Sequence, residues 1–147
     1  MFKMKRKFKV LLTRRLHDFA LTELRERCEI TIHSGKIPMP KQKILEKIKD
    51  KDGLICFPYD IIDQEILDST NKLKTISTFS VGFDHIDINY AKKKRITIGY
   101  TPDVLTNATA ELTIGLILDL LRRITEGDHI IRKGKWNEIF GPFDYVG

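Results

Sequence analysis

Short apolar runs alternate with amphipathic segments between Phe8 and Tyr100. The runs occupy residues 8–13, 29–33, 53–57, 73–79 and 96–100. Between them, apolar side chains recur at helical spacing, as Ile44, Leu45 and Ile48 do. Apolar strands that alternate with helices are typical of a parallel sheet covered by helices. The pattern therefore predicts an α/β fold, in which a doubly wound, flavodoxin-like layer is built on a five-stranded parallel sheet.

The sequence changes character around Pro102. A long helix is predicted from about Ala108 to about Arg132, with Thr106 or Asn107 as its amino-terminal cap. The first half of this helix is apolar on nearly every side, and such a helix is expected to be buried on nearly every side. A second surface is therefore expected against it, supplied by a further domain, by another copy of the chain, or by both.

Composition and charge bear on the kinds of partner that this chain can bind. Hydrophobic residues make up 41% of the 147 residues, enough for a single core, and Lys and Arg exceed Asp and Glu by 26 to 20. The basic residues gather at positions 3–9 and 92–95, beside an expected strand and at the end of an expected helix. Aromatic residues do not interleave with them as a base-stacking surface requires. We interpret the charge as a solvated surface and expect no nucleic-acid partner.

Cysteine and histidine usage gives no sign of a metal site. Cys28 and Cys56 are too few and too far apart for a disulfide framework or a zinc site, and the 4 histidines lack ligand spacing. Both thiols are expected to be buried, in a reducing compartment. No stretch approaches the roughly 18 apolar residues of a membrane span, and the basic start lacks the apolar core of a secretion signal. These features predict a cytoplasmic protein without a membrane partner.

The most informative pattern follows the fourth expected strand. Residues 80–84, S-V-G-F-D, form a glycine turn at the carboxyl end of that strand, where open parallel sheets bind ligands. Backbone N–H groups of Val81 and Gly82 can approach an anion there, because glycine places no side chain over them. The alternative is a plain strand-to-helix turn, in which Gly82 takes a positive φ and Asp84 or Asp87 caps the next helix.

Two motifs carry a family resemblance. S-V-G-F-D-H-I-D at residues 80–87 and G-Y-T-P-D-V-L-T-N-A-T-A-E at residues 99–111 resemble the D-isomer-specific 2-hydroxyacid dehydrogenases, and within them the glyoxylate and hydroxypyruvate reductases. The resemblance extends from about Lys9 to Trp136. It implies an enzyme that transfers a hydride from NADH or NADPH to a small 2-oxo acid, glyoxylate or hydroxypyruvate, to give a D-2-hydroxy acid.

The resemblance also implies what this chain contributes. Family members continue into a dinucleotide-binding unit with a G-x-G-x-x-G turn, followed by the arginine, glutamate and histidine of the reaction, and this glycine pattern does not occur in the 147 residues. The chain is therefore interpreted as an amino-terminal portion with no catalytic residue and no turnover of its own. Residues 1–101 are expected to be the substrate-binding domain, and residues 102–147 the interdomain helix and a dimerisation arm. The arm is rich in aromatic residues and predicts a homodimer; its aromatic residues are Trp136, Phe140, Phe143 and Tyr145.

Four residues receive site roles from the resemblance, namely Val81, Gly82, Pro58 and Thr106. The first two would bind the substrate carboxylate through their N–H groups, and Pro58 would line the substrate pocket. Thr106 would contact the cofactor or act as an ordinary helix cap. Asp84 is expected to hold the loop, and His85 to be a solvated turn residue. A non-catalytic dimer that senses a cofactor or binds a small anion stays open as the alternative, and the sequence does not distinguish NAD from NADP.

Overall fold

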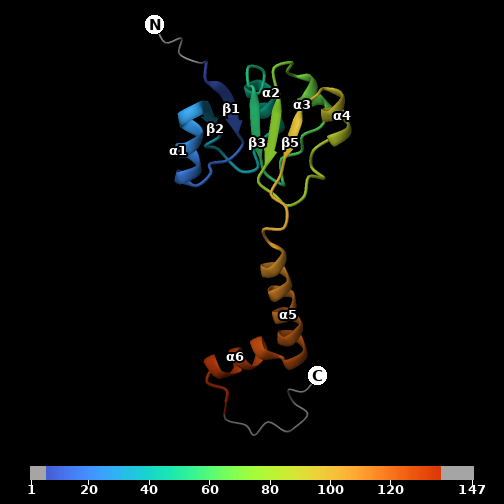
Figure 1. Ribbon diagram of the computed structural model, residues 1–147. Helices are drawn as coiled ribbons and strands as arrows, with labels where there is room; N and C mark the ends of the chain where they lie inside the picture. Colours follow the sequence, from blue (N-terminus) through green and yellow to red (C-terminus); the bar gives the residue numbers. More distant parts are fainter. Residues whose placement is uncertain (1–5, 137–147) are drawn as a thin grey trace. The chain divides into compact units, whose positions relative to one another are not determined.

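The structure is a computed structural model that describes residues 6–136. Its contacts divide the chain into two compact units, Met1–Pro102 and Asp103–Gly147, and each unit is described by itself. The first unit holds the sheet and the second holds two helices (Figure 1). Among the described residues, no helix combines the length and the apolar character that crossing a bilayer requires.

The first unit is built on a five-stranded parallel sheet. The strands are β1 (Phe8–Leu12), β2 (Cys28–Ile32), β3 (Gly53–Cys56), β4 (Thr75–Thr78) and β5 (Thr97–Gly99). Their order across the sheet is β2-β1-β3-β4-β5, and every neighbouring pair is parallel. This is the flavodoxin-like order, so the predicted fold class is confirmed.

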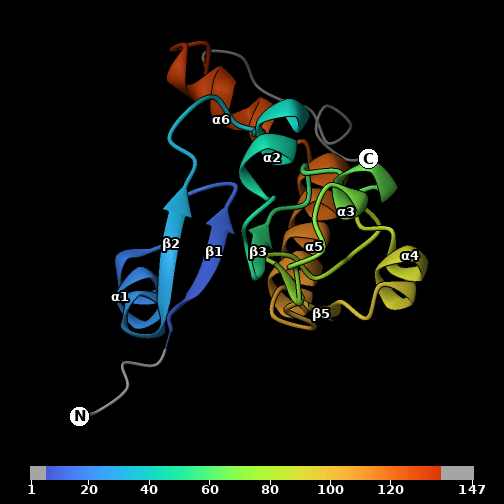
Figure 2. The same cartoon turned by 90° about the horizontal axis from the view of Figure 1, so that it is seen from above.

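Helices cover both faces of this sheet. The helix α1 (Asp18–Arg27) packs on one face, whereas α2 (Lys41–Lys47), α3 (Gln64–Asp68) and α4 (Ile88–Lys93) pack on the other. Figure 2 shows α1 beside β2 and away from the other three helices.

The strand β1 shows why apolar runs form this sheet. Val10 and Leu12 pack with Leu21 of α1, whereas Leu11 between them joins the core on the opposite face. Successive side chains of a strand point to opposite faces. A strand that is covered on both faces therefore needs a continuous apolar run, and this is the pattern that the sequence contains.

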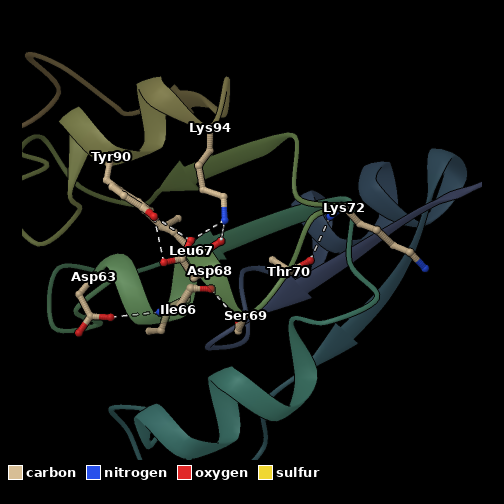
Figure 3. Close-up of polar contacts among 9 residues, drawn as sticks. All are labelled: Asp63, Ile66, Leu67, Asp68, Ser69, Thr70, Lys72, Tyr90 and Lys94. Carbon is tan, nitrogen blue, oxygen red and sulfur yellow. Dashed lines mark hydrogen bonds and ion pairs between the residues drawn. The ribbon is translucent and has the colours of Figure 1, made fainter.

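Short polar contacts fix α4 against α3 (Figure 3). The carboxylate of Asp68 accepts hydrogen bonds from the Lys94 ammonium at 2.8 Å and from the Tyr90 hydroxyl at 2.9 Å. These two donors, Lys94 first, lower the pKa of Asp68. Asp63 and Asp87 accept hydrogen bonds from N–H groups in the first turns of α3 and α4, at 3.2 and 2.9 Å. Of the two caps that the plain-turn alternative named, Asp84 and Asp87, the structure shows Asp87 in this role.

Two helices form the described part of the second unit, α5 (Thr106–Arg122) and α6 (Ile124–Arg132). The prediction of one helix to Arg132 was wrong at Arg123, whose φ of 51° is left-handed. The carboxylate of Asp119 accepts hydrogen bonds from the N–H and the hydroxyl of Thr125, at 2.7 and 2.8 Å. These bonds satisfy donors at the start of α6, so the chain ends one helix and begins another.

The start of α5 also differs from the prediction. Leu105 occupies the cap position and makes no side-chain hydrogen bond, so neither Thr106 nor Asn107 caps the helix. A cap residue precedes the first helical residue, and Thr106 is already the first helical residue of α5.

The apolar surface of α5 is exposed within its own unit. No residue of the helix is buried. The exposed apolar side chains are Leu112, Ile114, Leu116, Ile117, Leu118, Leu120 and Leu121. A surface that covers them stays a prediction. The same holds for the aromatic arm, since Trp136 is exposed and Phe140, Phe143 and Tyr145 lie outside the described residues.

Candidate functional site

Three loops meet at the carboxyl edge of the sheet. The strands β1, β3 and β4 are adjacent, so the loops that follow them share one edge. Backbone hydrogen bonds tie the first residues of the two flanking loops to the end of β3, because the Thr13 N–H donates to the Ile55 carbonyl at 3.0 Å and the Phe79 N–H donates to the Cys56 carbonyl at 2.9 Å. The loop that carries Pro58 therefore lies beside the glycine turn.

A buried carboxylate closes the loop after β3. Asp60 is 2% exposed, and its Oδ2 accepts hydrogen bonds from the Thr13 hydroxyl at 2.5 Å and from the Phe57 N–H at 2.8 Å. The Asp60 N–H donates to the Phe57 carbonyl at 3.0 Å. Its Oδ1 is buried and has no hydrogen-bond partner among the described residues. This side-chain-closed turn holds the exposed Pro58 on a fixed backbone.

Hydroxyl groups lock the glycine turn. The Ser80 hydroxyl donates to the Gly82 carbonyl at 2.5 Å and lies 2.7 Å from the Thr78 hydroxyl. The Ser80 carbonyl accepts hydrogen bonds from both the N–H and the hydroxyl of Thr101, each at 2.9 Å. The turn is thereby tied to the segment after β5. The prediction that Asp84 holds the loop was wrong, because its carboxylate is exposed and makes no hydrogen bond within the described residues.

Two donors of the turn are unused. Neither the Val81 N–H nor the Gly82 N–H donates a hydrogen bond within the described part of the chain. Gly82 does not take a positive φ, so the plain-turn alternative was wrong about the reason for this glycine. A Cβ at Gly82 would meet only the Asp84 Oδ2, at 3.6 Å. Free N–H groups without a covering side chain are what an anion cradle requires, and the assignment of this cradle stays a prediction.

His85 lies behind the turn and is not the solvated residue that was expected. It is half-buried, and its Nε2 lies 2.8 Å from the hydroxyl of the buried Thr78. The His85 carbonyl accepts a hydrogen bond from the Ile62 N–H at 2.8 Å. Burial lowers the pKa of His85, against the opposing carboxylates of Asp60 and Asp84. The ring therefore packs behind the turn and helps to support it.

An aromatic cluster lines the same edge. The Phe57 ring lies 5.9 Å from the Tyr59 ring and 5.5 Å from the Phe79 ring, measured between centroids. The Arg14 guanidinium lies over the Phe57 ring at 5.7 Å and donates to the Tyr59 hydroxyl at 3.1 Å. Pro58 thus stands between two aromatic residues that an arginine contacts. Phe57, Pro58 and Tyr59 together form a bulky wall at this edge of the sheet.

Comparison with known proteins identifies the family. Residues 10–140 match the family model of the D-isomer specific 2-hydroxyacid dehydrogenase catalytic domain. The chain belongs to this family. The D-isomer specific 2-hydroxyacid dehydrogenases are oxidoreductases, so the family and the enzyme class inferred from the two sequence motifs are confirmed.

Relatives from several organisms share sequence or fold with this chain. A glyoxylate reductase of Thermofilum pendens is 46% identical over 140 residues, which are 95% of this chain and 41% of that protein. The crystal structure of the TT0316 protein from Thermus thermophilus has a TM-score of 0.83 and 40% identity, over 94% of this chain and 44% of that one. A D-lactate dehydrogenase from Aquifex aeolicus, complexed with NAD and lactic acid, has a TM-score of 0.73 and 26% identity, over 90% of this chain and 39% of that one. The chain therefore spans about two fifths of the length of these relatives.

One residue of this chain, Thr106, is the predicted cofactor contact. The sequence has no G-x-G-x-x-G turn. Thr106 is exposed at the start of α5, and its hydroxyl makes no hydrogen bond within the described residues. One free hydroxyl at a helix start can contact a cofactor but does not make a binding site for a dinucleotide.

The thiols were predicted less well than the fold. Cys56 is buried, but Cys28 is only half-buried, because it begins the edge strand β2. Between residues 6 and 136, no group of three or more His, Cys, Asp or Glu side chains could hold a metal ion.

Sequence reasoning missed the polar groups beneath the two loops. Asp60, Thr13 and Thr101 hold the loops in place, yet none of them was a candidate. One signal was available, because Pro58 stands at the second position of the turn 57–60, a position that proline favours. Thr13 and Thr101 gave no such signal, since their partners lie far away in the sequence.

Proposed function

We propose that this chain is the amino-terminal portion of an enzyme that reduces a small 2-oxo acid to a D-2-hydroxy acid with NADH or NADPH. The observation that carries the proposal is the pair of unused donors, the N–H groups of Val81 and Gly82, at the carboxyl edge of a parallel sheet. A carboxylate that accepts both hydrogen bonds would be held in a fixed orientation. Glyoxylate is a proposed substrate, following the name of the relatives, and hydroxypyruvate is the other substrate that the sequence motifs imply.

Pro58 contributes a rigid wall beside the cradle. Asp60 fixes its backbone, and Phe57 and Phe79 bring the wall up to the glycine turn. A wall of apolar side chains excludes water from the reacting carbonyl, which strengthens the hydrogen bonds to the carboxylate. Orientation and exclusion of water are the contributions that we assign to this chain, since the residues that transfer protons belong to a further domain.

The remaining proposals concern the whole protein. A nicotinamide cofactor, NAD or NADP, would be held by a further domain, with Thr106 as a contact from this chain. Residues 1–101 would bind the substrate, and residues 102–147 would link the domains and contribute to a homodimer. The exposed apolar side of α5 supports this proposal, because a second domain or subunit would cover it. The two free thiols support a cytoplasmic location.

Substitution of Gly82 tests the cradle. Gly82→Ala is compatible with the backbone, because its Cβ would meet only one atom, at 3.6 Å. The added methyl group would crowd an anion that approaches the two N–H groups. We expect the affinity for oxamate, an unreactive mimic of glyoxylate, to fall roughly tenfold, as expected for loss of one charge-assisted hydrogen bond.

Amide NMR of the labelled chain measures this affinity at the residues concerned. In the unmodified chain, oxamate should shift the amide signals of Val81 and Gly82 more than those of other residues. Gly115→Ala is the matched control, because a Cβ there meets nothing within 4 Å. Equal oxamate affinities for Gly82→Ala and the unmodified chain would refute the proposal.

A further inference from the structure

Arg14 lies beside the loop that carries Pro58. It is held by the residues on either side of Pro58, since it donates to the Tyr59 hydroxyl at 3.1 Å and lies 5.7 Å from the centroid of the Phe57 ring. A planar guanidinium that contacts an aromatic face has a restricted orientation. The loop therefore positions a positive charge at the carboxyl edge of the sheet.

The charge of Arg14 has no carboxylate partner within the part of the chain that the structure describes. Its contacts there are a neutral hydroxyl and an aromatic ring. Its neighbour Arg15 differs, because it forms an ion pair with Asp18. A guanidinium carries five N–H donors in a fork that matches a carboxylate. Arg14 therefore keeps donors that a bound anion can use.

The position of Arg14 relative to the glycine turn sets the length of such an anion. The strand β3 separates β1 from β4, and neighbouring strands lie about 4.8 Å apart, so the two loops begin about 10 Å apart. Phe57 directly follows β3, the strand between them, and its ring centroid lies 5.5 Å from that of Phe79, which follows β4. The space between the two anion-binding groups is therefore bordered by apolar surface, which suits the methylene groups of an extended acid.

We propose that Arg14 is a specificity-determining residue that binds a second carboxylate, at the far end of the substrate. This inference rests on the proposed function, in which the N–H groups of Val81 and Gly82 hold the carboxylate next to the carbonyl. The substrates then extend beyond glyoxylate to 2-oxo dicarboxylic acids, which would bind more tightly than 2-oxo monocarboxylic acids of the same length. Glyoxylate is too short to reach Arg14 and uses the glycine turn alone.

Two ligands of the same carbon chain test the proposal. 2-Oxoglutarate ends in a carboxylate, whereas 2-oxopentanoate ends in a methyl group. Amide NMR titration of the full chain should give about fivefold tighter binding of 2-oxoglutarate, the factor expected for one solvent-exposed ion pair. Arg14→Met should remove this preference and leave the affinity for 2-oxopentanoate unchanged. Arg15→Met is the control, because it changes the net charge equally and should keep the preference.

The outcomes separate the inference from the proposed function. Equal affinities for the two ligands in the unmodified chain, or a preference that survives Arg14→Met, would overturn the role of Arg14 while the Val81 and Gly82 signals still shift. If Arg15→Met loses the preference equally, the role of Arg14 would also be overturned, because the preference would then come from general attraction by positive charge. If neither ligand shifts the Val81 and Gly82 signals, the proposed function fails and the inference fails with it.

Discussion

Removal of the Asp60 carboxylate should destabilise the first unit, because it leaves the buried Phe57 N–H unpaired and leaves the Thr13 hydroxyl only the Ile55 carbonyl, at 3.4 Å. The Thr13 hydroxyl and the Phe57 N–H both donate to Asp60 Oδ2, and these three residues are 0%, 7% and 2% exposed. A buried donor that loses its partner costs about 1–3 kcal/mol. Against this, Asp60→Ala also removes Oδ1, a buried acceptor without a partner among the described residues. We expect a net loss of about 2–3 kcal/mol in the free energy of unfolding.

Two further variants resolve the contributions. Asp60→Asn keeps one oxygen that can accept both hydrogen bonds, so it should lie within about 1 kcal/mol of the unmodified chain. Thr13→Val removes the hydroxyl itself, so no donor is left unpaired. This variant should lose about 1 kcal/mol in the free energy of unfolding. Asp18→Asn is the surface control, because its ion pair with Arg15 is exposed and such pairs contribute little.

Urea denaturation followed by far-UV circular dichroism measures these differences. The order of stability should be unmodified chain and Asp60→Asn, then Thr13→Val, then Asp60→Ala. The account of the loop is refuted if Asp60→Ala is as stable as the surface control, or if Asp60→Asn is as unstable as Asp60→Ala.

Two other predictions follow from the shifted pKa values. Ammonium groups and other hydrogen-bond donors lower the pKa values of four carboxylates below the ordinary 3.8, namely those of Asp50, Asp63, Asp68 and Asp87. The unfolded chain therefore binds more protons than the folded chain. The stability that these carboxylates contribute is complete above about pH 4 and is lost as the pH falls through their pKa values in the folded chain. A melting temperature that is unchanged between pH 6 and pH 2.5 would contradict this. Burial raises the pKa of Cys56 to about 12, so iodoacetamide at pH 8 should label the half-buried Cys28 first, and equal labelling rates would count against the burial of Cys56.

The sheet could be predicted because its signal is local. Each strand is a short apolar run, and residues such as Leu11 and Val10 must face opposite cores. The helix break could not be predicted in this way. It depends on the left-handed conformation of Arg123 and on the Asp119 carboxylate that bonds Thr125, whereas the propensities of the residues favour one continuous helix.

The site was predictable in part for a similar reason. The turn with Gly82 and the loop with Pro58 are visible as motifs, and the parallel sheet brings their strand ends together. The bonds that shape them join residues far apart, such as Thr13 with Asp60 and Ser80 with Thr101, which are separated by 47 and 21 positions. Without the fold, nothing pairs these residues.

A crystal structure of the chain with oxamate bound tests the central claim most directly. We predict that the oxamate carboxylate lies about 3 Å from the nitrogens of Val81 and Gly82, with Pro58 beside it. A carboxylate bound at another place, or nitrogens of Val81 and Gly82 that donate to protein oxygens while oxamate is bound, would contradict the account.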